Sequence, residues 1–293
     1  MEFLLSFVNI LRQMSSSSSS SSSNDPYKES ARAVISQSLL SDKAILKCIQ
    51  AKRILIEPFN MQNLGTTSYD VSLGMHYFRE SEPEAGMGVY NPYSAEMVDR
   101  VWGVPQVAEK LYDWTARTLQ TLQNISSEDF VIWLKPGETI LGHTEEFIGG
   151  RETVTTMMKA RSSMGRNFIE VCKCAGWGDI GYVNRWTMEI TNNSRHYSIP
   201  LIVGRRIAQI IFFDTDGTLT RGQGSYERSG KYQKTDDMRQ LKRNWKPYDM
   251  LPRMYEDREI CRSSFIENIS WVYPKGSGEL VLRDEKEKAG LMN

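Results

Sequence analysis

The stretch from Phe130 to Phe213 limits the fold of this 293-residue chain more than any other part. It is a succession of short runs rich in Val, Ile, Thr and aromatic residues, broken by turn residues at Pro136-Gly137, Gly149-Gly150, Asn192-Asn193 and Gly204. Short runs of this kind at this spacing are typical of antiparallel strands and do not alternate with helical segments. The sequence therefore predicts a mainly β fold, a jelly roll or a related β-sandwich or barrel.

The segment before this stretch begins with helical spacing and continues with strands. Residues Asp25 to Gln50 place apolar side chains at helical intervals, and Ser41 with Asp42 offers an N-cap for the second of two short helices. Ile54 to Phe59 and Tyr69 to Phe78 then alternate like strands. We expect short N-terminal helices followed by the first strands of the sheet.

Two further segments interrupt or extend this β-rich part. Val107 to Leu122 has apolar residues at intervals of three and four and no strand character, which predicts a helical insertion at about 80–129. Near the end of the chain, SWVY and GELVLRD offer one or two more strands. The predicted organisation is a domain over 25–236, including the insertion, and a C-terminal extension over 237–293.

The N-terminus contains an unbroken serine run, Ser15 to Ser23, which cannot bury apolar surface. The apolar run before it is too short to span a bilayer and lacks the features of a signal peptide. Translation starting at Met14 is an open alternative. We expect residues 1–24 to be a disordered tail.

The overall charge excludes some classes of partner. Lys plus Arg and Asp plus Glu number 36 each, so no global field attracts a nucleic acid polymer or an anionic membrane. An anionic ligand must be held by a local cluster, which favours a small polyanion. The four cysteines form no regular framework, which favours a reducing, cytoplasmic compartment and thiols used as small apolar residues.

Such a local cluster occurs in the strand-like segment RSSMGR. Arg161 and Arg166 flank Ser162, Ser163 and Gly165, and together they supply fork-shaped donors, hydroxyls and a close backbone approach for phosphate oxygens. Taken alone, the segment is equally consistent with a solvated basic turn.

Two acidic residues follow this cluster. Asp179 lies in the glycine-rich AGWGDIGYVN, where it can accept a hydrogen bond from a sugar hydroxyl or cap a turn. Glu189 lies among the apolar Trp186, Met188 and Ile190, a setting that raises the pKa of a carboxyl toward values useful for proton transfer. Periodicity alone leaves open that Glu189 is an outward-facing strand residue.

The order and spacing of these motifs resemble the dCTP deaminase branch of the dUTPase-like superfamily. The match runs without a gap from Arg161 to Asn192, and together with looser segments it covers roughly half the chain. It extends more loosely to SYDVSLG, LKPGETILGHTEEFI, VGRRIAQIIFF, Tyr226 and the triplet Lys231-Tyr232-Gln233. The insertion, the serine tail and most residues after Asp236 have no counterpart in the resemblance.

The resemblance implies a dUTPase-like distorted jelly roll that forms a homotrimer with active sites between subunits. It implies hydrolysis of the 4-amino group of dCTP to give dUTP and ammonia, with Mg²⁺ carried by the nucleotide and no metal or zinc bound by the protein. Glu189 would be the general acid/base, acting on a water held near Ser162 and the carbonyl of Ala175.

The resemblance also assigns substrate contacts. Arg161, Ser162, Ser163 and Arg166 would bind the triphosphate, and Asp179 would bind the 3′-hydroxyl of the sugar. The strand of Thr187, Met188 and Glu189 would bind the base edge, and Gln209, Tyr226 and Lys231 would close over the phosphates.

Two departures from the family pattern bear on the mechanism. Trp177 stands where single-step members commonly carry a basic residue, and the Ala-Gly-aromatic pattern is similar to bifunctional members that also convert dUTP to dUMP. In those, the residue matching Asp179 helps to activate the hydrolytic water. Thr235 replaces a glutamine of the closing segment, which leaves open a trimeric nucleotide-binding protein without turnover.

Two rival enzyme classes have partial motifs. His143 and Glu145 form an H-x-E as in zinc deaminases, but Cys172 and Cys174 form C-x-C in a strand-like run instead of P-C-x-x-C on a helix. Asp214 and Asp216 form the D-x-D-G-T of haloacid-dehalogenase-like phosphatases, but a polar, turn-rich segment follows instead of a doubly wound domain. Both classes lack the structural context that their chemistry requires.

Overall fold

The computed structural model describes residues 39–83, 86, 88–215, 230–233, 235–257, 270–272 and 281–283. The chain divides into two compact units, Met1–Ser81 with Trp102–Leu251, and Glu82–Val101 with Pro252–Asn293. The predicted N-terminal tail and the first predicted short helix lie outside the described residues.

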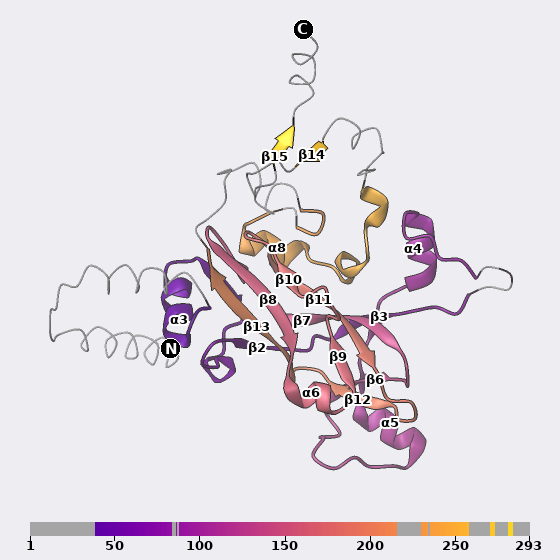
Figure 1. Ribbon diagram of the computed structural model, residues 1–293. Helices are drawn as coiled ribbons and strands as arrows, with labels where there is room; N and C mark the ends of the chain where they lie inside the picture. The colour runs from indigo at the N-terminus through magenta and orange to yellow at the C-terminus, as the bar shows by residue number, and fades with distance from the viewer. Residues whose placement is uncertain are drawn as a thin grey trace, which may run out of the picture. The chain divides into compact units, whose positions relative to one another are not determined.

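The first unit contains three antiparallel sheets (Figure 1). The six-stranded sheet has the order β4-β3-β7-β11-β9, and β1 also pairs with β7. Its strands are β1 (Ile54–Glu57), β3 (His76–Arg79), β4 (Gln106–Val107), β7 (Thr139–Gly150), β9 (Ile169–Val171) and β11 (Val183–Asn192).

The second sheet has four strands in the order β10-β8-β13-β2, and the third has three in the order β12-β6-β5. Their strands are β2 (Tyr69–Ser72), β5 (Glu109–Lys110), β6 (Phe130–Leu134), β8 (Val154–Ala160), β10 (Trp177–Gly178), β12 (Ile199–Ile202) and β13 (Arg206–Asp214). Within the described residues, no pairing closes a sheet into a barrel.

The main core is shared by the six-stranded and four-stranded sheets. Trp186, Met188 and Ile190 of β11 belong to one cluster of buried side chains with Ile210 and Phe212 of β13. Alternation explains this arrangement, because every second residue of each strand points to the same side of its sheet. The mainly β prediction is confirmed, and the two sheets stay open.

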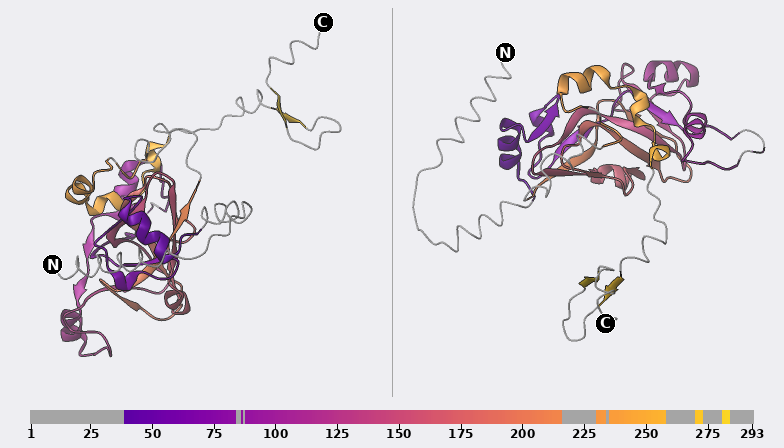
Figure 2. Two further views of the ribbon diagram at one scale, coloured as in Figure 1. Left: turned by 90° about the vertical axis from the view of Figure 1, so that its left-hand side faces the viewer. Right: turned by 90° about the horizontal axis from the view of Figure 1, so that it is seen from above.

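Helices lie at the edges of the sheets and over one face of the six-stranded sheet, as Figures 1 and 2 show. Ser41 is the N-cap of the first described helix, as predicted, and its side chain accepts a hydrogen bond from the amide of Ala44. The helices are α3 (Asp42–Gln50), η1 (Met61–Asn63), α5 (Leu111–Thr118), α6 (Ser162–Arg166), α8 (Met238–Asn244) and η2 (Pro247–Met250). No helix among the described residues is long and apolar enough to cross a membrane.

The second unit, in its described part, contains α4 (Ala95–Trp102, which ends one residue beyond the unit boundary), η3 (Met254–Glu256) and the hairpin of β14 (Ser270–Val272) with β15 (Val281–Arg283). The hairpin confirms the two strands predicted near the end of the chain. The two helices α4 and α5 confirm the helical character of the insertion.

Two predictions about local structure were wrong, and one helix was not predicted. The insertion does contain strand residues, because β4 and β5 add to the edges of two sheets. Ser162–Arg166 is one turn of helix and not a strand, since three amides of the turn bond to carbonyls three or four residues earlier. The polar segment after Asp236 forms α8, which Asp237 caps by accepting hydrogen bonds from the amides of Arg239 and Gln240.

Candidate active site

Glu189 lies on the face of β11 that points away from the main core. Its neighbours Trp186, Met188 and Ile190 are buried in that core, whereas Arg185, Thr187 and Glu189 alternate with them and are half-buried. The apolar neighbours noted in the sequence therefore do not share the face of Glu189. Its surroundings come from other parts of the sheet.

The carboxyl of Glu189 is nevertheless shielded from water. Its Oε2 atom is buried without a hydrogen-bond partner among the described residues. This burial raises the pKa of Glu189, and the nearby charge of Lys173 opposes the shift. The direction agrees with the expectation from the sequence, and it favours proton uptake by a carboxyl that must accept a proton and return it.

A tight turn between β9 and β10 lies beside Glu189. The amide of Cys172 donates to the carbonyl of Glu189 at 3.0 Å, and the amide of Ala175 donates to the carbonyl of Cys172 at 2.7 Å. Gly176 packs directly against the backbone of β8, where an added Cβ atom would lie 2.3 Å from the carbonyl oxygen of Met158. The turn thus brings the exposed Ala175 to the strand that carries Glu189, as the resemblance implies.

The predicted phosphate cluster forms a separate, open end of the candidate site. Ser162, Ser163 and Arg166 lie on α6 and are exposed. Within the described residues, Arg166 makes no ion pair. Its guanidinium is therefore available to an anion from solution.

Arg161 differs from Arg166 because an acidic residue holds it. Its Nε atom lies 3.2 Å from Oδ2 of Asp70, and Nη1 of Arg206 lies 3.2 Å from the same oxygen. The alternation of β2 turns this half-buried carboxylate away from the core, since Tyr69 and Val71 on either side of it are fully buried. Asp70 was not among the predicted site residues, although its strand belonged to the loosely matching segments.

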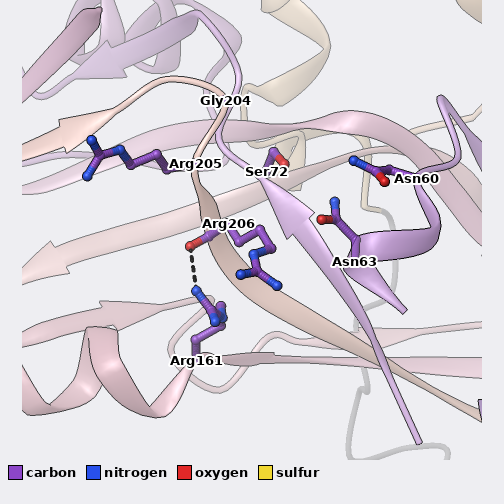
Figure 3. A pocket seen from close by; sticks show the side chains of 7 residues that line it. All are labelled: Asn60, Asn63, Ser72, Arg161, Gly204, Arg205 and Arg206. Atoms are coloured by element: carbon purple, nitrogen blue, oxygen red, sulfur yellow. Dashed lines mark hydrogen bonds between the residues drawn. The ribbon is translucent and has the colours of Figure 1, made fainter. Parts of the chain in front are cut away.

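Beside this ion pair lies a polar pocket of 370 Å³. Figure 3 shows Arg161 donating to the backbone carbonyl of Arg206 on one wall of the pocket. The residues that line the pocket are Asn60, Asn63, Ser72, Arg161, Gly204, Arg205 and Arg206. Gln209 lies nearby on β13, half-buried and paired with Asp70 in the sheet register.

Asp179 is exposed in the turn after β10, and Trp177 before it is 57% exposed. The carbonyl of Asp179 accepts a hydrogen bond from the amide of Tyr182 at 3.0 Å. This bond closes a turn, and the Asp179 side chain stays accessible to a ligand.

The segment from Tyr226 to Gln233 was predicted to close over the phosphates, and its last residue contacts the turn after Asp179 and the start of β11. The side-chain amide of Gln233 accepts from the amide of Val183 at 2.7 Å and donates to the carbonyl of Gly181 at 3.0 Å. Gln233 is 4% exposed, and the half-buried Lys231 lies two residues before it. Tyr226 lies outside the described residues. The sequence offered no signal for this role of Gln233 beyond its place in the matching triplet.

Thr235, which replaces the glutamine of the closing segment, takes part in the start of α8. Its hydroxyl accepts from the amide of Asp237 at 3.2 Å and lies 3.3 Å from the side chain of Gln240. The residue at this position therefore supports the helix that follows.

The chain brings the predicted residues together in three groups and not in one. Glu189 and Thr187 lie near the turn of Ala175, Asp179 lies near Gln233, and the phosphate cluster lies on α6. Among the described residues, no hydrogen bond or ion pair joins the α6 cluster to Glu189 or Asp179.

The two rival motifs have structural roles. Both ring nitrogens of His143 are engaged, one at 2.8 Å from the carbonyl of Thr144 and the other accepting from the amide of His76 at 3.2 Å. Among the described residues, no group of three or more His, Cys, Asp or Glu could hold a metal ion. Asp214 ends an antiparallel strand and accepts from Arg53 and Thr153 at 2.5 Å, and Asp216 lies outside the described residues.

The prediction that the thiols serve as small apolar residues is confirmed only in part. Cys48 and Cys172 are buried free cysteines, and Cys174 is exposed, which corrects the expectation for that residue. Cys261 lies outside the described residues.

Comparison with known proteins places residues 39–215 in a family model described as dCTP deaminase-like. The chain is 30% identical over 179 residues to "dCTP deaminase, dUMP-forming" from Methanococcus maripaludis, covering 60% of this chain and 82% of that protein. It is 31% identical over 180 residues to a protein of the same name from Hydrogenobaculum sp., covering 61% of this chain and 83% of that protein.

Among solved structures, the chain is similar to a 2′-deoxycytidine 5′-triphosphate deaminase from Agrobacterium tumefaciens. The identity is 18%, the TM-score is 0.42, and the match covers 61% of this chain and 49% of that one. A match to the EIAV dUTPase has 19% identity and a TM-score of 0.27, and it covers 35% of this chain and 86% of that one.

Proposed function

The chain belongs to the dCTP deaminase-like family, and we propose that it catalyses the hydrolytic deamination of dCTP: dCTP and water give dUTP and ammonia. The observation that carries this proposal is the shielded carboxyl of Glu189. A partly buried carboxylate with an unpaired oxygen and a raised pKa is costly to maintain, and binding alone does not require it.

In the proposed reaction, Glu189 takes a proton from a water molecule as that water adds to C4 of the cytosine ring. The same carboxyl then gives the proton to the leaving amino group, so that the C–N bond breaks and ammonia departs. The carbonyl of Ala175 and the hydroxyl of Ser162 would hold the water. Thr187 and Met188, through the β11 backbone, would bind the base edge.

The exposed α6 cluster would bind the triphosphate. Arg166 would form charge-assisted hydrogen bonds to phosphate oxygens, with Ser162 and Ser163 donating their hydroxyl protons. Arg161 is already paired with Asp70, so we assign it to shaping the cluster more than to supplying free charge. Mg²⁺ would arrive with the nucleotide as part of the substrate.

The separation of the α6 cluster from Glu189 within one chain supports an active site that two subunits share. Because α6 and Glu189 are not joined within the described chain, we propose a homotrimer in which one subunit supplies phosphate contacts and its neighbour supplies the base end. Gln209, Tyr226 and Lys231 would close over the phosphates. Analytical ultracentrifugation should then give a mass of three chains, and a stable, active monomer would contradict this arrangement.

A second function, hydrolysis of dUTP to dUMP and pyrophosphate, is favoured by the relatives, which are named dUMP-forming. The exposed Asp179 beside Trp177 would activate the water for this step. Asp179→Asn should then accumulate dUTP while ammonia is still released. Unchanged dUMP formation in that variant would remove Asp179 from the second step.

The test of the proposed function is a time course with purified protein, Mg²⁺ and dCTP that resolves ammonia, dUTP and dUMP. Ammonia with accumulating dUTP supports deamination alone, and ammonia with dUMP supports both steps. Nucleotide binding without any ammonia would overturn the proposal in favour of a nucleotide-binding protein without turnover.

A further inference from the structure

The face of the six-stranded sheet that carries Glu189 and Thr187 also carries a row of deeply buried side chains. Glu189 lies opposite Leu141, which lies opposite Phe78, and Thr187 lies opposite His143. Opposite residues of antiparallel strands share one face. Phe78 and His143 are 0% exposed, so another part of the protein covers this face on the side of β3 and β7.

The cover is the segment Asp237–Leu251, which we call the strap. It comprises α8 and η2, and the right-hand view of Figure 2 shows it lying over the strands. The Trp245 ring lies 4.7 Å from the ring of His143, and the guanidinium of Arg185 lies 4.7 Å from the Trp245 ring. Tyr248 meets Phe78 edge-on at 5.7 Å.

The strap is a packed part of its unit. Leu241, Met250 and Leu251 are buried, which anchors the strap by apolar contact. An ion pair between Lys242 and Glu57 ties the last turn of α8 to β1. Immediately before the strap, the guanidinium of Arg151 donates to the carbonyl of Asp236.

Trp245 contacts two residues that neighbour Thr187 in the sheet, Arg185 and His143, and both can fix the position of Thr187. Arg185 lies two residues before Thr187 on the same face of β11, and His143 lies directly across from it. Glu145 also holds Arg185, at 3.2 Å. His143 has no room to retreat, since a Cβ atom on Gly74 would lie 2.0 Å from its ring. We therefore expect a change at Trp245 to disturb β11 between Arg185 and Glu189.

We propose that the strap forms a wall at the base end of the active site, with Trp245 as a positioning residue that acts through Arg185 and His143 on Thr187 and Glu189. The proposal rests on the proposed function. The family model ends at residue 215, so the strap is a feature of this chain outside the matched region. A cover on the side of β3 and β7 leaves the base to enter from the side of β9.

The test separates binding of the base from binding of the phosphates. Calorimetry would measure the binding of dCTP and of inorganic tripolyphosphate, each with Mg²⁺, to proteins that carry Glu189→Gln. Ammonia release would be measured separately in proteins that keep Glu189. Trp245→Ala should weaken dCTP binding by about tenfold or more, as truncation of a well-packed aromatic residue does, and change tripolyphosphate binding by less than about twofold. Trp245→Phe should restore most of the dCTP affinity.

The matched control is Tyr112→Ala, which truncates an aromatic residue that is 60% exposed on α5. This substitution should leave the affinity for both ligands unchanged. The proposal would be overturned if Trp245→Ala weakened the binding of both ligands equally, or if it changed the binding of neither. If the alanine variant does not fold, Trp245→Leu must show the same difference between the two ligands. A wild type that releases no ammonia, with no dCTP binding in the Glu189→Gln protein, would instead overturn the proposed function and this inference with it.

Discussion

The two ends of the candidate site differ in how completely the chain builds them. The base end lies on a long central strand, Glu189 is shielded there, and the strap and the Cys172–Gly176 turn hold its surroundings. The phosphate end is a single exposed turn of helix whose Arg166 has no ion pair within the described residues. In the proposed function, the chain itself builds most of the base end, whereas a ligand or a second subunit would complete the phosphate end.

This difference fits the chemistry that we propose for each end. Proton transfer requires a carboxyl held in one position and kept from bulk water, which a packed strand provides. A highly charged triphosphate supplies its own strong interactions, and exposed donors pay little desolvation before it binds. Substitutions at the two ends should therefore change different measured quantities.

The largest expected effect is at the base end. Glu189→Gln keeps the shape of the side chain and removes its ability to accept a proton, so ammonia release should fall by about 10²–10⁴-fold. Binding of dCTP, measured by calorimetry, should stay within about threefold. Glu170→Gln on the adjacent strand β9 is the matched control, since Glu170 is exposed, and it should retain full activity. Loss of dCTP binding in Glu189→Gln would show that the carboxyl is structural.

At the phosphate end, Arg166→Ala should weaken dCTP binding by about 10- to 100-fold, because it removes charge-assisted hydrogen bonds to phosphate. The kcat at saturating dCTP should change far less. Steady-state kinetics would separate the two constants, and the exposed Arg195, substituted by Ala, is the control. An unchanged KM in Arg166→Ala would remove α6 from the phosphate site and break the comparison.

The smallest effect concerns stability and pH. Burial raises the pKa of Glu189 in the folded state, so the folded protein binds more protons than the unfolded chain between the two pKa values. Stability is therefore lost as pH rises through that interval. Glu189→Gln should raise the Tm relative to wild type at pH 7 and lose that advantage at pH 4, as measured by calorimetry. A difference in Tm that is independent of pH would mean that the carboxyl is solvated.

The pH dependence of catalysis sharpens the same point. Because Glu189 must be ionised to accept a proton, kcat should fall on the acid side with a midpoint above the ordinary carboxyl value of about 4.3. A midpoint at the ordinary value would argue against shielding in the enzyme–substrate complex.

Local sequence patterns predicted the strands and the alternation that places Glu189, because period-two spacing follows directly from strand geometry. They missed the helical turn at Ser162–Arg166, whose residues have no apolar spacing to reveal it. They also missed α8, because its apolar contacts, such as Leu241, are few and its partners lie far away in the sequence. Trp245 and Gln233 gained their roles only from contacts with strands 50 or more residues earlier, which no local pattern contains.

The most direct test of hydrolysis by Glu189 is the reaction of dCTP in water enriched in oxygen-18, followed by mass spectrometry of the uracil base within the nucleotide product. The account predicts one heavy oxygen atom in the base for the wild type, formed in step with ammonia, and no labelled base above background for Glu189→Gln. Ammonia release without label in the base, or equal labelling by the Glu189→Gln protein, would contradict it.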